Sequence, residues 1–124
     1  MASPLTPFER LFKALADTTR LRILGLLLRG EVCVCHIHES LRVPQPKVSR
    51  HLAYLRRAGL VETRRAGVWV HYRLADTSDP ALKTIRDAVV QALGRSDAVR
   101  RDAGRLQKRT VRPVVTARRP ESRS

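Results

Sequence analysis

Apolar side chains recur at helical spacing through the first half of the chain, and capping residues separate the repeats into four helices. The spacing predicts helices over residues 6–16, 19–28, 34–41 and 46–58. Asp17 can cap the second helix, and Gly30 can follow its end. The prolines at 44 and 46 stop the third helix and start the fourth, whose apolar stripe is Val48, Leu52 and Leu55.

After Gly59 the period changes from helical to alternating. Residues 60–65 and 68–74 are typical of two strands joined by a tight turn at Ala66-Gly67, which predicts a β-hairpin. Asp79 and Pro80 then favour the start of a fifth helix. Its apolar face consists of Leu82, Ile85, Val89, Ala92 and Leu93.

Charge divides the chain into two parts. The 124 residues carry a formal net charge of +14, and residues 95–124 hold half of it in under a quarter of the length. We therefore expect a domain over residues 1–94 and a basic, disordered tail over residues 95–124, although residues 97–107 could extend the fifth helix. No stretch has the length of a membrane span and no secretory signal is visible, so we expect a cytoplasmic protein without a membrane partner.

Four helices, a hairpin and a fifth helix, in that order, predict a mainly α winged helix-turn-helix fold with a small β-hairpin. In this fold the helix after the turn enters the major groove of DNA. The stripe of the fourth helix leaves four polar side chains near its N-terminal end, where base edges are read: Gln45, Lys47, Ser49 and Arg50. Arg64 and Arg65 lie near the hairpin tip and suit contact with phosphates or the minor groove.

Other functions fit the residues less well. The arginines could form a solvated face, or the protein could be a non-sensing, basic nucleic-acid-binding protein driven by its tail. RNA-binding modules use an aromatic pattern that this chain lacks. The sequence contains no nucleophile elbow, phosphate loop or zinc-hydrolase spacing, so we do not expect an enzyme.

A pair of cysteines, Cys33 and Cys35, precedes the helix-turn-helix. Thiolates are soft ligands that suit thiophilic ions and match calcium or magnesium poorly. On a regular helix, residues i and i+2 point about 200° apart, so both sulfurs could hold one ion only if the first helical turn were distorted or unformed. Ligation is therefore expected to strain the third helix, and a helix N-terminus with nearby histidine is expected to lower the thiol pKa values.

Four blocks carry a resemblance to a known family: FKALADTTRLRILGLL, EVCVCHIHESL, QPKVSRHLAYLRRAGLV and RRAGVWVHYRL. Over residues 8–93 the chain resembles the arsenic-responsive repressors, the ArsR/SmtB winged-helix regulators. The resemblance implies a repressor of arsenic-resistance genes that binds a double-stranded operator with an inverted repeat. It implies release when arsenite or antimonite binds Cys33 and Cys35, with no required cofactor. It also implies a homodimer joined through the first and last helices, with interface residues Leu5, Phe8, Leu82, Ile85 and Val89.

The chain departs from the family pattern after the cysteine pair. Some members have a third cysteine where this chain has His38, so the third ligand is left open between His38, a solvent or small-thiol ligand, and none. A nitrogen ligand suits zinc or cadmium better than arsenic, and sensing of those metals or of thiol oxidation remains an alternative. Other members bind zinc through acidic and histidine ligands on the last helix; here that helix has no histidine, so we expect no such site.

Overall fold

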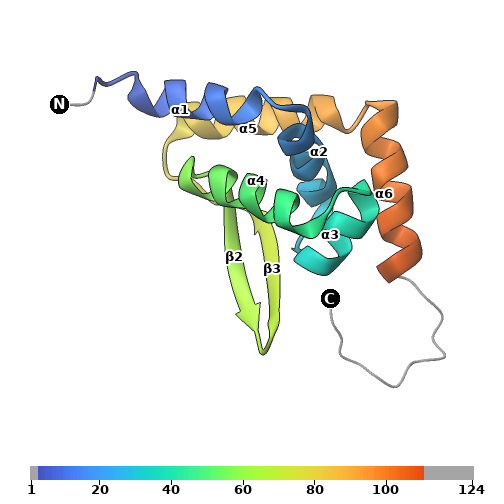
Figure 1. Ribbon diagram of the computed structural model, residues 1–124. Helices are drawn as coiled ribbons and strands as arrows, with labels where there is room; N and C mark the ends of the chain where they lie inside the picture. Colours follow the sequence, from blue (N-terminus) through green and yellow to red (C-terminus); the bar gives the residue numbers. More distant parts are fainter. Residues whose placement is uncertain (1–2, 111–124) are drawn as a thin grey trace.

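The computed structural model describes residues 3–110, which form six helices and a small antiparallel sheet (Figure 1). The helix-turn-helix consists of α3 (Val34–Leu41) and α4 (Gln45–Arg57), and the hairpin of β2 (Val61–Ala66) and β3 (Trp69–Leu74) follows it. The predicted order of these elements is confirmed, with bounds shifted by one or two residues. The other elements are α1 (Thr6–Leu15), α2 (Thr18–Leu26), a short 3-10 helix η1 (Leu27–Arg29), β1 (Val32–Cys33), α5 (Pro80–Leu93) and α6 (Asp97–Thr110).

One apolar core holds α4 against the other helices. The stripe predicted for α4, Val48, Leu52 and Leu55, is fully buried, as are Ile23 and Leu24 of α2. Burying one such side chain contributes roughly 1.5–3 kcal/mol, so the stripe fixes which side of α4 faces outward. Among residues 3–110, no helix is long and apolar enough to cross a membrane.

The hairpin belongs to a three-stranded sheet, because the short strand β1 pairs with β3. The strand order is β1-β3-β2, all antiparallel, and Cys33 lies opposite His71 of β3. The sequence predicted only the two long strands. Two residues are too few to show an alternating pattern, so β1 had no detectable signal.

The expectation of a disordered tail from residue 95 is wrong for residues 97–110. These residues form α6, a separate helix that packs on α2 and α3 (Figure 1). Its charge density suggested a solvated segment, but Val99 is 5% exposed and Asp102 only 1%. The two buried positions stand three residues apart, which places them on one face of the helix. Residues 111–124 lie outside those that the structure describes.

A buried carboxylate anchors α6. Asp102 accepts two hydrogen bonds from Arg22 of α2, at 2.9 and 2.8 Å, and one from Arg105 at 2.6 Å. Burying an ion costs several kcal/mol. Three charge-assisted hydrogen bonds of about 1.5–3 kcal/mol each are sufficient to offset it. The same guanidinium groups donate to the carbonyls of Leu41 (2.8 Å) and Ser40 (2.6 Å), and so cap the end of α3.

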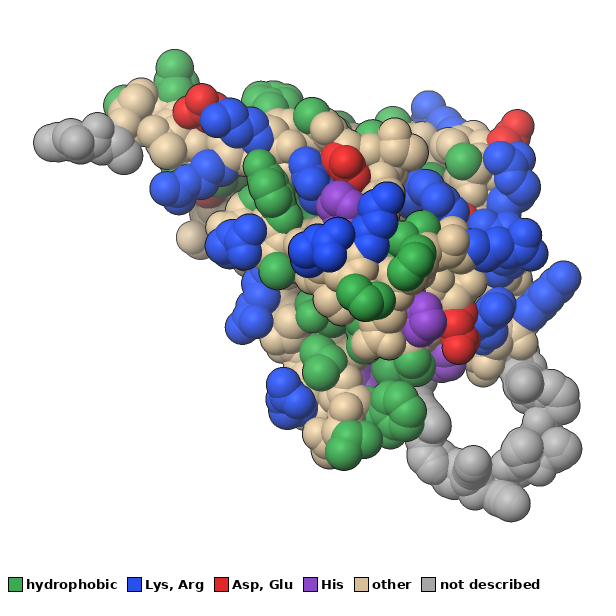
Figure 2. Space-filling view, viewed as in Figure 1, with side chains coloured by type: hydrophobic (Ala, Val, Ile, Leu, Met, Phe, Trp, Pro, Cys, Tyr) green, Lys and Arg blue, Asp and Glu red, His purple; other side chains and the backbone are tan. Residues whose placement is uncertain are grey.

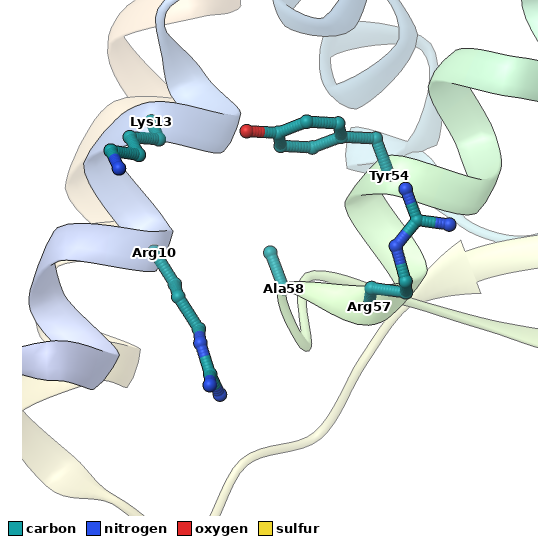
Figure 3. A pocket seen from close by; sticks show the side chains of 5 residues that line it. All are labelled: Arg10, Lys13, Tyr54, Arg57 and Ala58. Atoms are coloured by element: carbon teal, nitrogen blue, oxygen red, sulfur yellow. The ribbon is translucent and has the colours of Figure 1, made fainter. Parts of the chain in front are cut away.

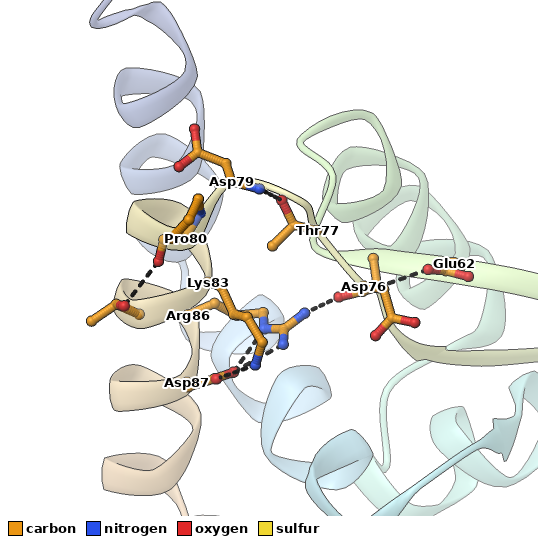
Figure 4. Close-up of polar contacts among 10 residues, drawn as sticks. Glu62, Asp76, Thr77, Asp79, Pro80, Lys83, Arg86 and Asp87 are labelled. Atoms are coloured by element: carbon orange, nitrogen blue, oxygen red, sulfur yellow. Dashed lines mark hydrogen bonds and ion pairs between the residues drawn. The ribbon is translucent and has the colours of Figure 1, made fainter.

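A polar turn ties the end of the sheet to α5 (Figure 4). Asp79 caps α5 as predicted, accepting from the backbone N–H of Ala81 at 2.9 Å. The buried guanidinium of Arg86 donates to the carbonyl of Ala75, just after β3, and to the carboxylate of Asp87. The position of α5 is therefore fixed relative to β3.

We predict that α6 docks through a close approach at Gly25. A Cβ at this position would lie 2.6 Å from Cγ1 of Val99, so the Gly25→Ala variant must displace α6 and is expected to lose about 1–3 kcal/mol of unfolding free energy. A Cβ at Gly104, also on α6, would have no atom within 4 Å, and Gly104→Ala is expected to gain about 0.5–1 kcal/mol. Urea denaturation of both variants at one protein concentration tests this, and equal stabilities would contradict the docking.

Candidate functional site

The first half of α4 presents the side chains predicted to read DNA. Gln45, Lys47 and Arg50 are exposed and Ser49 is half-buried, opposite the buried stripe. The turn before α4 contains Arg42, whose φ of 60° makes it the one non-glycine residue with positive φ among residues 3–110. Pro44 then precedes the first turn of α4 in an extended conformation. The structure therefore leaves the N-terminal end of α4 open to a ligand.

The two predicted wing arginines have different surroundings. Arg64 is bound to Glu31, just before β1, by three hydrogen bonds of 2.7–3.1 Å, and this guanidinium lowers the pKa of the Glu31 carboxyl. Arg65 is exposed and takes part in no ion pair within residues 3–110. Beyond it, Val68 and Trp69 form an exposed apolar tip, 83% and 42% accessible. Arg65 is therefore the wing cation available to a phosphate, whereas Arg64 links the wing to the cysteine segment.

Positive charge gathers on the face that displays α4. Figure 2 shows Lys and Arg side chains across α4 and along the edge formed by α6, with few acidic groups between them. A hollow of about 510 Å³ continues this surface between α1 and the second half of α4 (Figure 3). The ring of Tyr54 forms its wall, with the guanidinium of Arg20 4.1 Å from the ring centroid. Arg10, Lys13 and Arg57 line the hollow. The sequence pattern did not single out Arg10 and Lys13, because only their position beside α4 distinguishes them from other surface cations.

The two cysteines lie side by side without distortion of a helix. Cys33 ends β1 and precedes α3 in an extended conformation, with φ −68° and ψ 141°, and Cys35 lies in the first turn of α3. Their sulfur atoms are 2.8 Å apart. The separation of about 200° holds only for two helical residues, and it does not apply here because Cys33 precedes the helix, as in the alternative of an unformed first turn. A common ligand therefore needs no unwinding of α3.

The thiols are shielded from water. Cys33 is fully buried and Cys35 is half-buried. Burial, together with the hydrogen bond to Cys33, raises the pKa of the Cys35 thiol from 9.0 to about 12. The expectation that the helix N-terminus and nearby histidine lower this pKa is therefore wrong for Cys35, since the loss of hydration outweighs them.

His38 does not join the cysteine pair. Within residues 3–110, no three or more His, Cys, Asp or Glu side chains are placed to hold a metal ion together. His38 lies one turn further along α3, half-exposed, while Cys35 turns toward Cys33 at the end of β1. The structure therefore brings together two of the three candidate ligands.

The expected dimer residues lie on two neighbouring helices. Leu5 is 68% exposed, and Phe12 on the same side of α1 is 55% exposed. Figure 1 shows α1 and α5 along the same edge, and residues of both helices line one small cavity. On this edge Phe8, Leu82, Ile85 and Val89 are half-buried. An edge with accessible apolar groups on two helices has the character of a protein interface.

Comparison with known proteins agrees with this architecture. The family model for the bacterial regulatory protein, arsR family, matches residues 17–63. The arsenic resistance transcriptional regulator ArsR1 of Pseudomonas putida is 43% identical over 122 residues, covering 94% of this chain and 92% of that protein. The chain belongs to the arsR family.

Two further proteins to which the chain is similar are informative. The arsenical resistance operon repressor of Escherichia coli K12 is 57% identical over 72 residues, which are 57% of this chain and 61% of that protein. A homodimeric winged helix-turn-helix DNA-binding domain from Mycobacterium bovis aligns with a TM-score of 0.60 and 32% identity, over 75% of this chain and 87% of the other. The predicted winged helix-turn-helix fold and arsR-family membership are thereby confirmed.

We predict that Arg65 contributes more to DNA affinity than Arg64. The salt slope is the slope of the logarithm of the DNA-binding constant plotted against the logarithm of the salt concentration. Losing one phosphate contact lowers the magnitude of this slope by about 0.9. Arg65→Gln is expected to show this loss on double-stranded DNA in a fluorescence anisotropy titration. Arg64→Gln is expected to change the slope less, because its guanidinium is held by Glu31. A larger loss for Arg64→Gln would contradict the assignment.

Proposed function

We propose that the protein is a homodimeric transcriptional repressor of arsenic-resistance genes. It leaves its operator when trivalent arsenic or antimony binds Cys33 and Cys35. The observation that carries this proposal is the adjacency of the two sulfurs, 2.8 Å apart, on a strand of the wing sheet and the helix that follows it. The names of the relatives in Pseudomonas putida and Escherichia coli support the inducer class.

On the operator, α4 lies in the major groove with Gln45, Lys47, Ser49 and Arg50 toward the bases. Arg or Lys can pair with guanine and Gln with adenine in this groove. Two copies joined through the α1 and α5 edge place two such helices on the two halves of an inverted repeat, as the symmetry of a dimer requires. The homodimeric relative supports this assembly.

Ligation acts on the wing through β1. Cys33 belongs to β1, which pairs with β3, and Glu31 next to β1 holds Arg64 of β2. Replacing the sulfur–sulfur contact by two bonds to a common atom changes the spacing of the thiols and hence the position of β1. An inducer dissociates the complex only if it binds the DNA-free arrangement more tightly, and a typical coupling is about 5–150-fold in affinity.

We predict that each thiol is required for release but not for DNA binding. Arsenite is expected to weaken operator binding by the wild-type protein by about 5–150-fold. In Cys33→Ser and Cys35→Ser, arsenite is expected to leave operator affinity unchanged, because one sulfur alone cannot form the two bonds that hold the arsenic. Gel-shift titration with and without arsenite measures this. Release that persists in both single variants would refute the assignment.

Glu31→Gln provides a control for the proposed route in the same titration. This variant keeps both thiols but loses the ion pair to Arg64, so it is expected to bind arsenite with wild-type affinity and release DNA less completely. If Glu31→Gln releases DNA as fully as the wild type, the coupling does not pass through this ion pair.

We predict that the pH dependence of inducer binding identifies the ion class. The Cys35 thiol keeps its proton through neutral pH, since its pKa is raised to about 12. Zinc or cadmium must displace that proton, so their affinity rises about tenfold per pH unit for each proton released. Uncharged arsenious acid, As(OH)₃, condenses with two thiols to give two As–S bonds and two waters, with no net proton released.

Calorimetric titrations with arsenite, zinc and cadmium at several pH values between about 6.5 and 8 measure the difference. Arsenite affinity is expected to be flat with pH and to exceed that of both cations. Tighter binding of zinc or cadmium, with release of the operator at low concentration, would favour the alternative metal sensor. Hydrogen peroxide in a parallel gel shift tests the alternative of thiol oxidation.

A further inference from the structure

Helix α6 carries a row of cations along the side that borders α3. This α6 stripe consists of Arg101, Arg105, Lys108 and Arg109, whose spacing of four, three and one residues keeps them on one side of a helix. Arg101 and Lys108 are exposed. Arg105 and Arg109 reach α3, at the carbonyl of Ser40 (2.6 Å) and the carboxylate of Glu39 (3.1 Å). The stripe therefore lies directly beside the helix-turn-helix.

Acidic groups do not cancel the charge of the stripe. Of the two acidic residues of α6, Asp102 is buried between Arg22 and Arg105, and Asp97 lies in the first turn. Glu39, at 48% side-chain exposure, pairs with Arg109. Arg101 and Lys108 take part in no ion pair among residues 3–110. The outward-facing part of the stripe is therefore strongly positive.

The stripe continues the surface that holds the recognition helix. Arg42, which caps the end of α3, is exposed, as are Lys47 and Arg50 of α4. Figure 2 shows the cations of α4 and those along the α6 edge on the same face. The first helix of a helix-turn-helix crosses the DNA backbone, so a helix packed beside α3 adjoins the duplex next to the groove that α4 occupies.

We propose that the α6 stripe binds phosphates of the operator duplex just outside the base pairs read by α4. The inference rests on the proposed function, because it requires α4 to enter the major groove. The partner is a polyanion by charge complementarity, and continuity with α4 identifies it as the same DNA molecule. From Arg101 to Arg109 the helix rises about 12 Å, long enough for contacts to more than one backbone phosphate.

The anchoring of α6 makes such contacts efficient. The buried Asp102 network and the contact of Gly25 with Val99 hold the helix in one position. Charges on a preorganised helix lose less conformational entropy on binding than charges on a flexible tail. The contacts carry no sequence information, so they raise affinity and fix the register of the protein on DNA.

A pair of matched double variants of the full-length protein tests the proposal. Arg101→Gln with Lys108→Gln removes two exposed cations of the stripe without disturbing Arg105 or Arg109. Arg29→Gln with Arg100→Gln removes the same charge from η1 and from another side of α6, where both residues line a separate hollow. Circular dichroism melts verify that both variants keep the fold.

The probe is an operator duplex selected from random DNA by the wild-type protein. A short form ends at the base pairs protected by α4, and a long form adds about one helical turn (~10 base pairs) on each side. On the long duplex, the stripe variant is expected to lose about 0.9 in salt slope for each phosphate contact removed, and the matched variant much less. On the short duplex the two variants are expected to have equal salt slopes. Both are expected to keep their preference for the operator sequence.

Equal salt slopes for the two variants on the long duplex would overturn the inference and leave the proposed function intact. A stripe variant that loses as much on the short duplex as on the long one would also overturn it, because the contacts would then not lie in the flanks. A wild-type protein that selects no sequence would overturn the proposed function, and this inference with it.

Discussion

The buried carboxylate of Asp102 holds the helix-turn-helix in place against the rest of the molecule. It holds Arg22 of α2 and Arg105 of α6, and these two guanidinium groups donate to the last carbonyls of α3. The end of α3 is where the chain turns into α4, so the direction of α4 depends on a charge buried between two other helices. Breaking a buried ion pair by removing one partner costs about 3–5 kcal/mol. The helix-turn-helix is thus stabilised by contacts with α6 as well as by its own apolar core.

The sheet connects the cysteine pair to the hairpin. A winged hairpin can consist of two strands, but here the cysteine-bearing β1 is the third, and Glu31 with Arg64 adds an ion pair across the sheet. The thiol pair and the wing therefore belong to one hydrogen-bonded unit. The proposed inducer site is therefore joined to the wing by backbone hydrogen bonds between β1 and β3. The geometry of the pair follows from the extended backbone of Cys33, which brings the two sulfurs together.

Much of the fold was predictable because strong local patterns specified it. The stripe of Val48, Leu52 and Leu55 predicted which side of α4 is buried, and Asp79 with Pro80 predicted the start of α5. Three features were not predictable, because they depend on contacts distant in sequence. The strand β1 is defined by its pairing with β3. Helix α6 is stabilised by Arg22, some eighty residues earlier, and Arg64 forms an ion pair with Glu31. Composition alone assigned α6 to a disordered tail, since a buried carboxylate cannot be recognised without its partners.

Trp69 gives the wing an optical property of its own. It is the one tryptophan in the sequence, and it lies at the hairpin tip with 42% of its surface accessible. The emission of an indole depends on the polarity around it and on contact with quenching groups such as nucleobases. The tryptophan fluorescence of this protein therefore originates from the hairpin whose strand β3 pairs with the cysteine-bearing β1, and it reports on that hairpin without any attached label.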